Sequence, residues 1–153
     1  ADIKVFQTWL RNFSSDERKG VQNIIASGKK NYDKYIAELE RLESYFSFWK
    51  KYASQGIEYI GGIDEVGRGP LAGPVVTACV ILPVGCKILG VNDSKKLSAK
   101  KRDELFDIIM EKAVSVGIGM EDNNTIDDIN ILQATYKAMQ QAINNMPINH
   151  NNF

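Results

Sequence analysis

Residues 1–55 carry apolar side chains at intervals of three and four, which is the spacing of an amphipathic helix. Three such stripes follow one another, and each predicts a helix: Val5, Phe6, Trp9, Leu10 and Phe13; then, after a cap at Ser15, Val21, Ile24 and Ile25; then Tyr32, Tyr35, Leu39, Leu42, Phe46, Trp49 and Ala53. The third stripe has the period of a coiled-coil seam, so we expect it to pack on the two preceding helices or on another chain.

From Gln55 onward the pattern changes to strands that alternate with helices. We expect strands at 57–64, 75–82 and 113–120, and the second is apolar enough to be covered on both faces. Ser98 predicts the cap of a helix that buries Leu105, Ile108 and Ile109, and Thr125–Asp128 predicts a capping box. That last helix runs to Pro147, with an apolar seam at Ile129, Leu132, Tyr136, Met139, Ile143 and Met146.

The order β-β-α-β-α predicts an α/β fold in which a layered sheet is flanked by helices. We therefore divide the chain into a helical N-terminal extension, 1–55, and an α/β domain, 56–153.

Composition narrows the class of protein. A hydrophobic fraction of 44% and a charged fraction of 25% are typical of a soluble globular protein, and the net charge of zero means that any contact with nucleic acid must come from local clusters. The two cysteines, Cys79 and Cys86, are too few for a disulfide scaffold, and we interpret them as buried free thiols. Without a signal peptide or a membrane-length apolar run, we expect a cytoplasmic protein with no membrane contact.

Asp64 and Glu65 are adjacent at the point where we expect the first strand to end. Side chains alternate between faces inside a strand, but a pair at its exit can converge on one site. Two carboxylates suit Mg²⁺ or Mn²⁺, which accept hard oxygen ligands. Taken alone, such a pair is more typical of a solvated strand end.

Gly67, Arg68 and Gly69 follow the acidic pair directly. Glycines allow backbone groups to approach a ligand closely, and Arg68 would supply a charged fork for phosphate or ribose oxygens. The alternative is a turn in which the glycines only relieve steric strain. The spacing is not that of a phosphate-binding Walker loop.

A second polar cluster lies between the second strand and the next helix, at Asn92, Asp93, Ser94 and Lys95. It opens the densest basic patch in the chain, formed by Lys95, Lys96, Lys100, Lys101 and Arg102. A positive surface beside a carboxylate site is what a phosphodiester nuclease requires. The alternative is that Ser98 is only a helix cap and the lysines only improve solubility.

Three motifs together resemble the successive signatures of bacterial ribonuclease HII: Gly-Ile-Asp-Glu-Val-Gly-Arg-Gly-Pro-Leu-Ala-Gly-Pro from Gly62, Asn-Asp-Ser-Lys-Lys-Leu-Ser from Asn92, and Asn-Ile-Leu-Gln-Ala-Thr-Tyr-Lys-Ala-Met from Asn130. The resemblance covers residues 57–146, and residues 16–22 are similar to the helical extension of Gram-positive members.

The resemblance implies a ribonuclease H-like mixed sheet and an endonuclease that cleaves RNA paired with DNA, including single ribonucleotides in duplex DNA, leaving a 3′-hydroxyl upstream. Asp64 and Glu65 would be the first two of four carboxylates that hold two Mn²⁺ or Mg²⁺ ions. Gly67, Arg68 and Gly69 would sense the ribose 2′-hydroxyl. Lys95 would hold a phosphate, with Asn92 and Ser94 beside it.

In that family the third and fourth carboxylates follow the helix that ends here near Met146, whereas no Asp or Glu follows Asp128 in this sequence. We therefore expect this chain alone to be inactive or nearly so. A sheet without its next strand would have an open edge, through which copies of the chain would self-associate.

Two other functions remain open. A nucleic-acid-binding module would use the basic patch, and the helical region would add contacts through Arg18, Lys19, Lys29 and Lys30, unless these are merely solvated. A sugar-phosphate enzyme would use the Gly67–Gly69 loop as a phosphate cradle.

Overall fold

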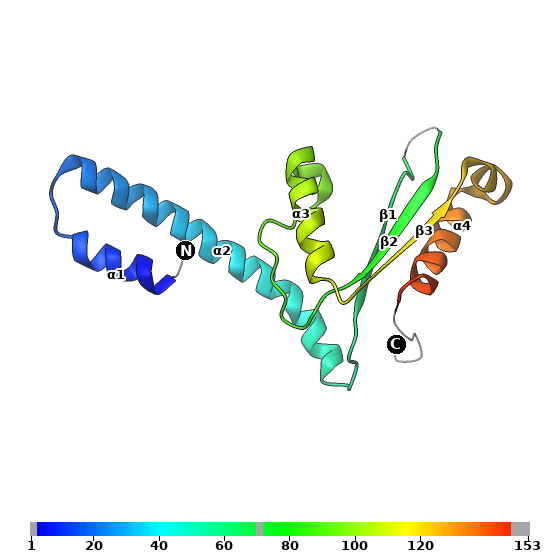
Figure 1. Cartoon of the computed structure of the whole chain (residues 1–153), viewed down its shortest axis with the longest axis horizontal. Helices are drawn as coiled ribbons and strands as arrows, with labels where there is room; N and C mark the ends of the chain where they lie inside the picture. The colour runs from blue at the N-terminus through cyan, green and yellow to red at the C-terminus, as the bar shows by residue number, and fades with distance from the viewer. Residues whose placement is uncertain (1–2, 70–71, 148–153) are drawn as a thin grey trace. The chain divides into compact units, whose positions relative to one another are not determined.

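The computed structural model describes residues 3–69 and 72–147, so that Pro70 and Leu71 of the first motif and the tail around His150 lie outside the described residues. Its elements are α1 (Ile3–Phe13), α2 (Lys19–Ala53), β1 (Gly61–Val66), β2 (Val75–Ile81), the 3-10 turn η1 (Ser94–Lys96), α3 (Ala99–Lys112), β3 (Ser115–Glu121) and α4 (Asn123–Asn144) (Figure 1). The chain groups into two compact units, Ala1–Ser44 and Tyr45–Phe153.

The second and third predicted helices are one continuous helix, α2, of 35 residues, which begins in the first unit and ends at Ala53 in the second. The predicted cap at Ser15 is wrong. The carboxylate of Asp16 instead accepts a hydrogen bond of 3.0 Å from the backbone N–H of Arg18, just before α2 begins. The Arg18 guanidinium also binds this carboxylate at 2.6 Å, and it lowers the pKa of Asp16.

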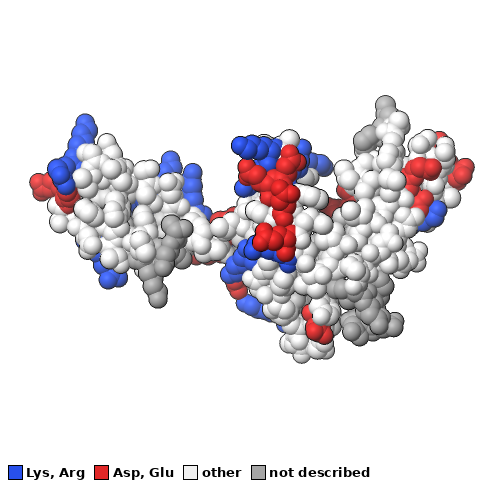
Figure 2. Space-filling model, viewed as in Figure 1, with Lys and Arg blue, Asp and Glu red and all other residues white. Residues whose placement is uncertain are grey.

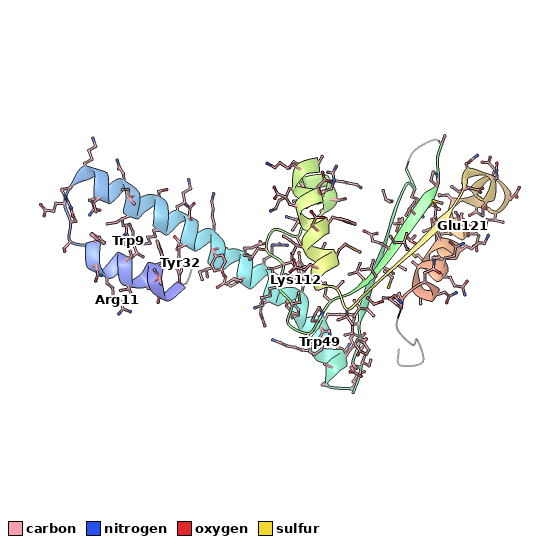
Figure 3. All side chains as sticks on the ribbon, in the orientation of Figure 1. Trp9, Arg11, Tyr32, Trp49, Lys112 and Glu121 are labelled. Atoms are coloured by element: carbon pink, nitrogen blue, oxygen red, sulfur yellow. The ribbon has the colours of Figure 1, made fainter. Side chains whose placement is uncertain are left out.

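Gly28 lies inside α2, at the point where α1 packs against this helix. A Cβ on Gly28 would stand 3.0 Å from Cε2 of Phe6. The ring of Phe6 also stacks on that of Tyr32, with centroids 5.1 Å apart, and Trp9 and Tyr32 lie in the space between the two helices (Figure 3). An aromatic cluster therefore holds α1 on one side of α2.

The second unit contains a three-stranded sheet in the order β1-β2-β3, and both described pairings are antiparallel. The predicted α/β class and the order β-β-α-β-α are confirmed. The first strand begins at Gly61, four residues later than predicted. The Ser98 cap of α3 is confirmed, since its hydroxyl accepts a hydrogen bond of 3.2 Å from the backbone of Lys101.

Helix α4 covers one face of this sheet (Figure 1). On that face β2 presents the buried residues Val75, Thr77, Cys79 and Ile81, and α4 presents Ala134, Ala138 and Ala142, all of which are fully buried. Two glycines of β3 make this possible, because a Cβ on Gly117 or Gly119 would overlap the carbonyl oxygen of Ala142 or Ala138. The helix backbone therefore rests directly on β3.

The predicted apolar seam of α4 is mostly wrong. Met146 is buried, but the four largest remaining members are exposed by 38–57%: Ile129, Leu132, Tyr136 and Ile143. The physical reason is the contact with β3, because a helix that rests on two glycines must present small side chains to them.

The start of α4 also differs from the prediction. Asp122 is the cap, and its carboxylate accepts a hydrogen bond of 2.8 Å from the backbone N–H of Thr125. The box predicted at Thr125–Asp128 is therefore wrong. Asn130 has a left-handed φ of 67° inside the helix, and its side chain caps the following turn at Leu132 and Gln133.

We expect Gly119→Ala to lower the free energy of unfolding by about 3 kcal/mol, because the added methyl must push α4 off the sheet. Chemical denaturation monitored by circular dichroism measures this change. Gly62→Ala is the matched control, since a Cβ there meets nothing within 4 Å. Equal stability of the two variants would contradict the close contact.

We expect Asp122→Ala to lower the melting temperature at neutral pH but not in acid. The hydrogen bond from the Thr125 backbone lowers the pKa of Asp122 in the folded state. The stabilisation from this carboxylate is therefore fully present above its unfolded pKa of about 4 and is lost as the pH falls through the folded pKa. Thermal melts of both proteins from pH 7 to pH 2 should converge in acid. A constant difference would show that the charge is not involved.

Candidate metal and substrate site

Asp64 and Glu65 lie inside β1, where they pair with Ala78 and Thr77 of β2, and the pairing continues to Val66. The backbone has therefore not left the pleat at this pair, and the prediction that the strand ends at the pair is wrong.

The strand pairing places the two carboxylates on opposite faces of the sheet. Cross-strand partners share a face, and Thr77 is buried under α4 whereas Ala78 is exposed. Glu65 thus belongs to the α4 face and Asp64 to the other. One oxygen of Asp64 accepts a hydrogen bond of 2.9 Å from the backbone N–H of Glu65. The structure does not bring the two side chains together, and their role as metal ligands stays a prediction.

Gly67 is required by the turn that leaves β1. Its φ is 92°, in the left-handed region that disfavours side chains, and a Cβ would overlap the carbonyl oxygen of Pro74. Gly69 is under no such constraint, because a Cβ there would meet no atom of the described residues within 4 Å. Gly67 is thus required by the backbone geometry of the turn, whereas Gly69 leaves open space beside Arg68.

Arg68 turns back toward the strand. Its NH1 lies 3.4 Å from Oε1 of Glu65, with 49% of the arginine side chain exposed and 22% of the glutamate. Solvent screens a pair of this kind, so the contact is weak. It nevertheless positions a guanidinium at the end of β1 with donors left for a ligand.

The second predicted cluster is an ordered turn. Asp93 caps η1 by accepting a hydrogen bond of 2.9 Å from the backbone of Lys95, and Asn92 accepts one of 2.9 Å from the backbone of Asp93. The Arg102 guanidinium donates to the carbonyl oxygens of Ser94 and Leu97, at 3.3 and 2.7 Å. Arg102 therefore anchors the turn. The prediction of a basic patch had assumed that its charge is free to bind a ligand, and it is not.

Lys101 is likewise engaged, since its Nζ lies 3.1 Å from Glu104. Lys95, Lys96 and Lys100 are exposed, and within residues 3–69 and 72–147 no ion pair joins them to an acid. The basic patch is therefore smaller than predicted and centres on these three lysines.

Within the described part of the chain, no hydrogen bond or ion pair joins Asn92, Ser94 or Lys95 to Asp64 or Glu65. Residues 3–69 and 72–147 contain no cluster of three or more His, Cys, Asp or Glu side chains that would hold a metal ion.

No helix in the described part of the chain is long and apolar enough to cross a membrane. Of the two cysteines, Cys79 is buried, which raises the pKa of its thiol, and Cys86 is half-buried.

Two polar groups on the α4 face could not be recognised from the sequence pattern. The hydroxyl of Thr77, opposite Glu65, is buried and has no hydrogen-bond partner among residues 3–69 and 72–147. Glu121 ends β3 beside α4 (Figure 3), where its carboxylate accepts from Lys137 at 3.1 Å and from Gln141. Since Gln141 also accepts from the backbone of Met120, this network ties α4 to the strand.

The fold is similar to that of a solved ribonuclease H2. The structure from Pyrococcus horikoshii OT3 superposes with a TM-score of 0.50 and 28% identity, over 59% of this chain and 46% of that one. This places the chain among ribonuclease H-like α/β proteins.

Comparisons of sequence identify the family. Residues 61–152 match the model of ribonuclease HII and residues 2–53 that of the ribonuclease HII N-terminal domain. The ribonuclease HII of Ligilactobacillus salivarius (strain UCC118) is 52% identical over 91% of this chain, and that of Clostridioides difficile (strain 630) is 49% identical over 94%. The chain belongs to the ribonuclease HII family. It spans 54% and 56% of the lengths of these two relatives.

We expect Gly67→Ala to destabilise the second unit by about 1–3 kcal/mol, because the new side chain is strained at a left-handed φ and meets Pro74. Thermal unfolding measures the loss. Gly69→Ala, two residues away, should leave the melting temperature within error. Equal loss in both variants would mean that the loop needs glycine for a reason other than backbone geometry.

Proposed function

We propose that this chain carries the ribose-sensing loop and the first metal-binding residues of an endonuclease. Its substrate would be the RNA strand of an RNA–DNA hybrid, or a single ribonucleotide embedded in duplex DNA, and the products would carry a 5′-phosphate and a 3′-hydroxyl. Membership of the ribonuclease HII family supports this proposal. The observation that carries it is the exposed guanidinium of Arg68, held by Glu65 at the end of β1 between Gly67 and Gly69.

The Arg68 loop has the chemistry needed to distinguish RNA from DNA. A 2′-hydroxyl both donates and accepts hydrogen bonds, and it is the one group on the sugar that separates the two nucleic acids. The guanidinium has five N–H donors, of which the contact with Glu65 at 3.4 Å occupies one. The open space at Gly69 would let the sugar approach these donors and the backbone N–H groups.

Mn²⁺ or Mg²⁺ would supply Lewis-acid chemistry to the complete enzyme, with two ions as the expected number. The described residues do not fit two ions, because they offer two carboxylates on opposite faces of β1 and no third acid beside them. We therefore assign this chain no hydrolytic step of its own and expect it to bind without cleaving.

A second candidate function follows from the same observation. A module that grips nucleic acid without cutting it needs no converging carboxylates, only donors and cations on its surface. The separation of Asp64 from Glu65 across the strand favours this function for the chain by itself.

The proposal predicts that the chain binds a duplex with one embedded ribonucleotide about 10-fold more tightly than the all-DNA duplex, the value of one charge-assisted hydrogen bond. Arg68→Ala should abolish this preference. Fluorescence anisotropy with both duplexes measures it. Arg11→Ala, an arginine on the exposed side of α1, is the matched control and should retain the preference.

Incubation of the same ribonucleotide-containing duplex with Mn²⁺ tests the absence of cleavage. We expect no product above background. Robust turnover that disappears in Asp64→Asn would refute the proposal that the chain only binds. Equal affinity for the two duplexes would refute the ribose-sensing role of the Arg68 loop.

A further inference from the structure

The first part of α2 has lysines on one side only. Residues 19–37 contain four lysines and one aspartate, with no other charged residue. At 100° per residue, Lys29, Lys30 and Lys34 fall within about 140° of the helix circumference. They line a shallow groove of about 550 Å³ together with Ala26, Asp33 and Ala37. We call these six residues the lysine groove.

The lysine groove faces away from α1. Gly28 and Tyr32, which contact α1, lie on the opposite side of the α2 circumference. Lysine and arginine side chains project from the α2 part of the unit on the side away from α1 (Figure 2). The three lysines of the groove are exposed, and no ion pair within the described ranges joins them to an acid.

We propose that the lysine groove binds the phosphate backbone of a nucleic-acid duplex. This inference rests on the proposed function, since it assigns part of the affinity for the same nucleic acid to the N-terminal unit. The small side chains of Ala26 and Ala37 leave a hollow between the cations, so that a sugar-phosphate strand would lie between the lysine stems.

The length of the lysine groove fits a polyanion. The groove runs from Ala26 to Ala37, 11 residues apart, which is about 16 Å along a helix. A duplex presents one phosphate for every 1.7 Å or so of its axis, so that several phosphates face a groove of this length. Lysine contributes here as a point charge, which suits contacts that carry no sequence information.

Other anionic partners fit the groove less well. A membrane surface requires apolar side chains beside the cations. The exposed Ile24 lies about 160° around the helix from Ala26, on the other side. An acidic protein would need aromatic or large apolar anchors in the centre of the contact. The groove offers only two alanines there.

The test uses the full chain and its triple variant Lys29→Ala, Lys30→Ala, Lys34→Ala in anisotropy titrations over a range of NaCl concentrations. Removing three phosphate contacts should reduce the slope of log Kd against log [NaCl] by about 2–3 and weaken binding by about 10-fold at low salt. The loss should be equal for the all-DNA and ribonucleotide-containing duplexes, because phosphate contacts do not sense the 2′-hydroxyl.

Two further variants serve as controls. The triple Lys→Arg variant keeps the charge and should bind like the original chain. Asp33→Asn removes the only acid of the groove and should tighten binding to both duplexes by about 2-fold or more. Alanine favours helix, so loss of α2 in the triple Ala variant would be visible as lost ellipticity and is not expected.

An unchanged affinity and salt slope in the triple Ala variant would overturn the proposal. It would also be overturned if the same variant lost binding to phosphatidylserine-containing vesicles while duplex binding stayed intact. Failure of the proposed function has a different signature, in which the ribonucleotide preference is absent from the original chain although both duplexes still depend on the lysine groove.

Discussion

The contact between α4 and β3 is the constraint on which the second unit depends. Gly117 and Gly119 remove the side chains that would separate the two backbones, and Ala138 and Ala142 fit into the space. This contact buries one face of β2 completely, and the face so defined determines the register of β1 against it. Because Thr77 is on the buried face, Glu65 must be there too, and Asp64 must face the other way. The contact of α4 with β3 thus determines on which face of β1 each carboxylate of the candidate site lies.

The same contact leaves large apolar side chains without cover. The α4 stripe of Ile129, Leu132, Tyr136 and Ile143 is exposed, and so are Val66, Ile118 and Met120 on the Asp64 face of the sheet. In an α/β architecture a sheet is packed on both faces. The Asp64 carboxylate therefore lies among apolar side chains on an open surface. Glu65, on the other face, is already half-buried and in contact with Arg68.

Local signals in the sequence sufficed for the elements whose structure is decided locally. The β-branched run of β2 and the hydroxyl of Ser98 predicted their strand and helix cap correctly. The buried face of α4 could not be predicted from the periodicity of this helix alone. Its alanines are buried in place of the predicted seam because Gly117 and Gly119 of β3 allow the helix backbone to approach the strand. Ser15 and Thr125 failed as caps because each helix begins at another residue than predicted, where the carboxylate of Asp16 accepts from the backbone of Arg18 and that of Asp122 accepts from the backbone of Thr125. The Asp64–Glu65 pair was misplaced for a similar reason, since only the pairing with β2 shows that the strand continues beyond it.

A net charge of zero is compatible with strong local contacts because opposite charges are separated along α2. After the four lysines of 19–37 come Glu38, Glu40 and Glu43, but Glu38 is paired with Arg41 at 2.7 Å. Glu40 lies six residues beyond Lys34, about 9 Å along the helix, and Glu43 lies nine residues beyond it, about 14 Å, so both are farther away than the screening length of about 8 Å at physiological salt. A phosphate at the lysine groove would therefore experience mainly the three lysines and Asp33 of the groove itself. Phosphate contacts supply affinity that does not depend on sequence or sugar, whereas the proposed role of Arg68 would distinguish ribose from deoxyribose with a single group. A chain that carries both would separate the two tasks between its two units.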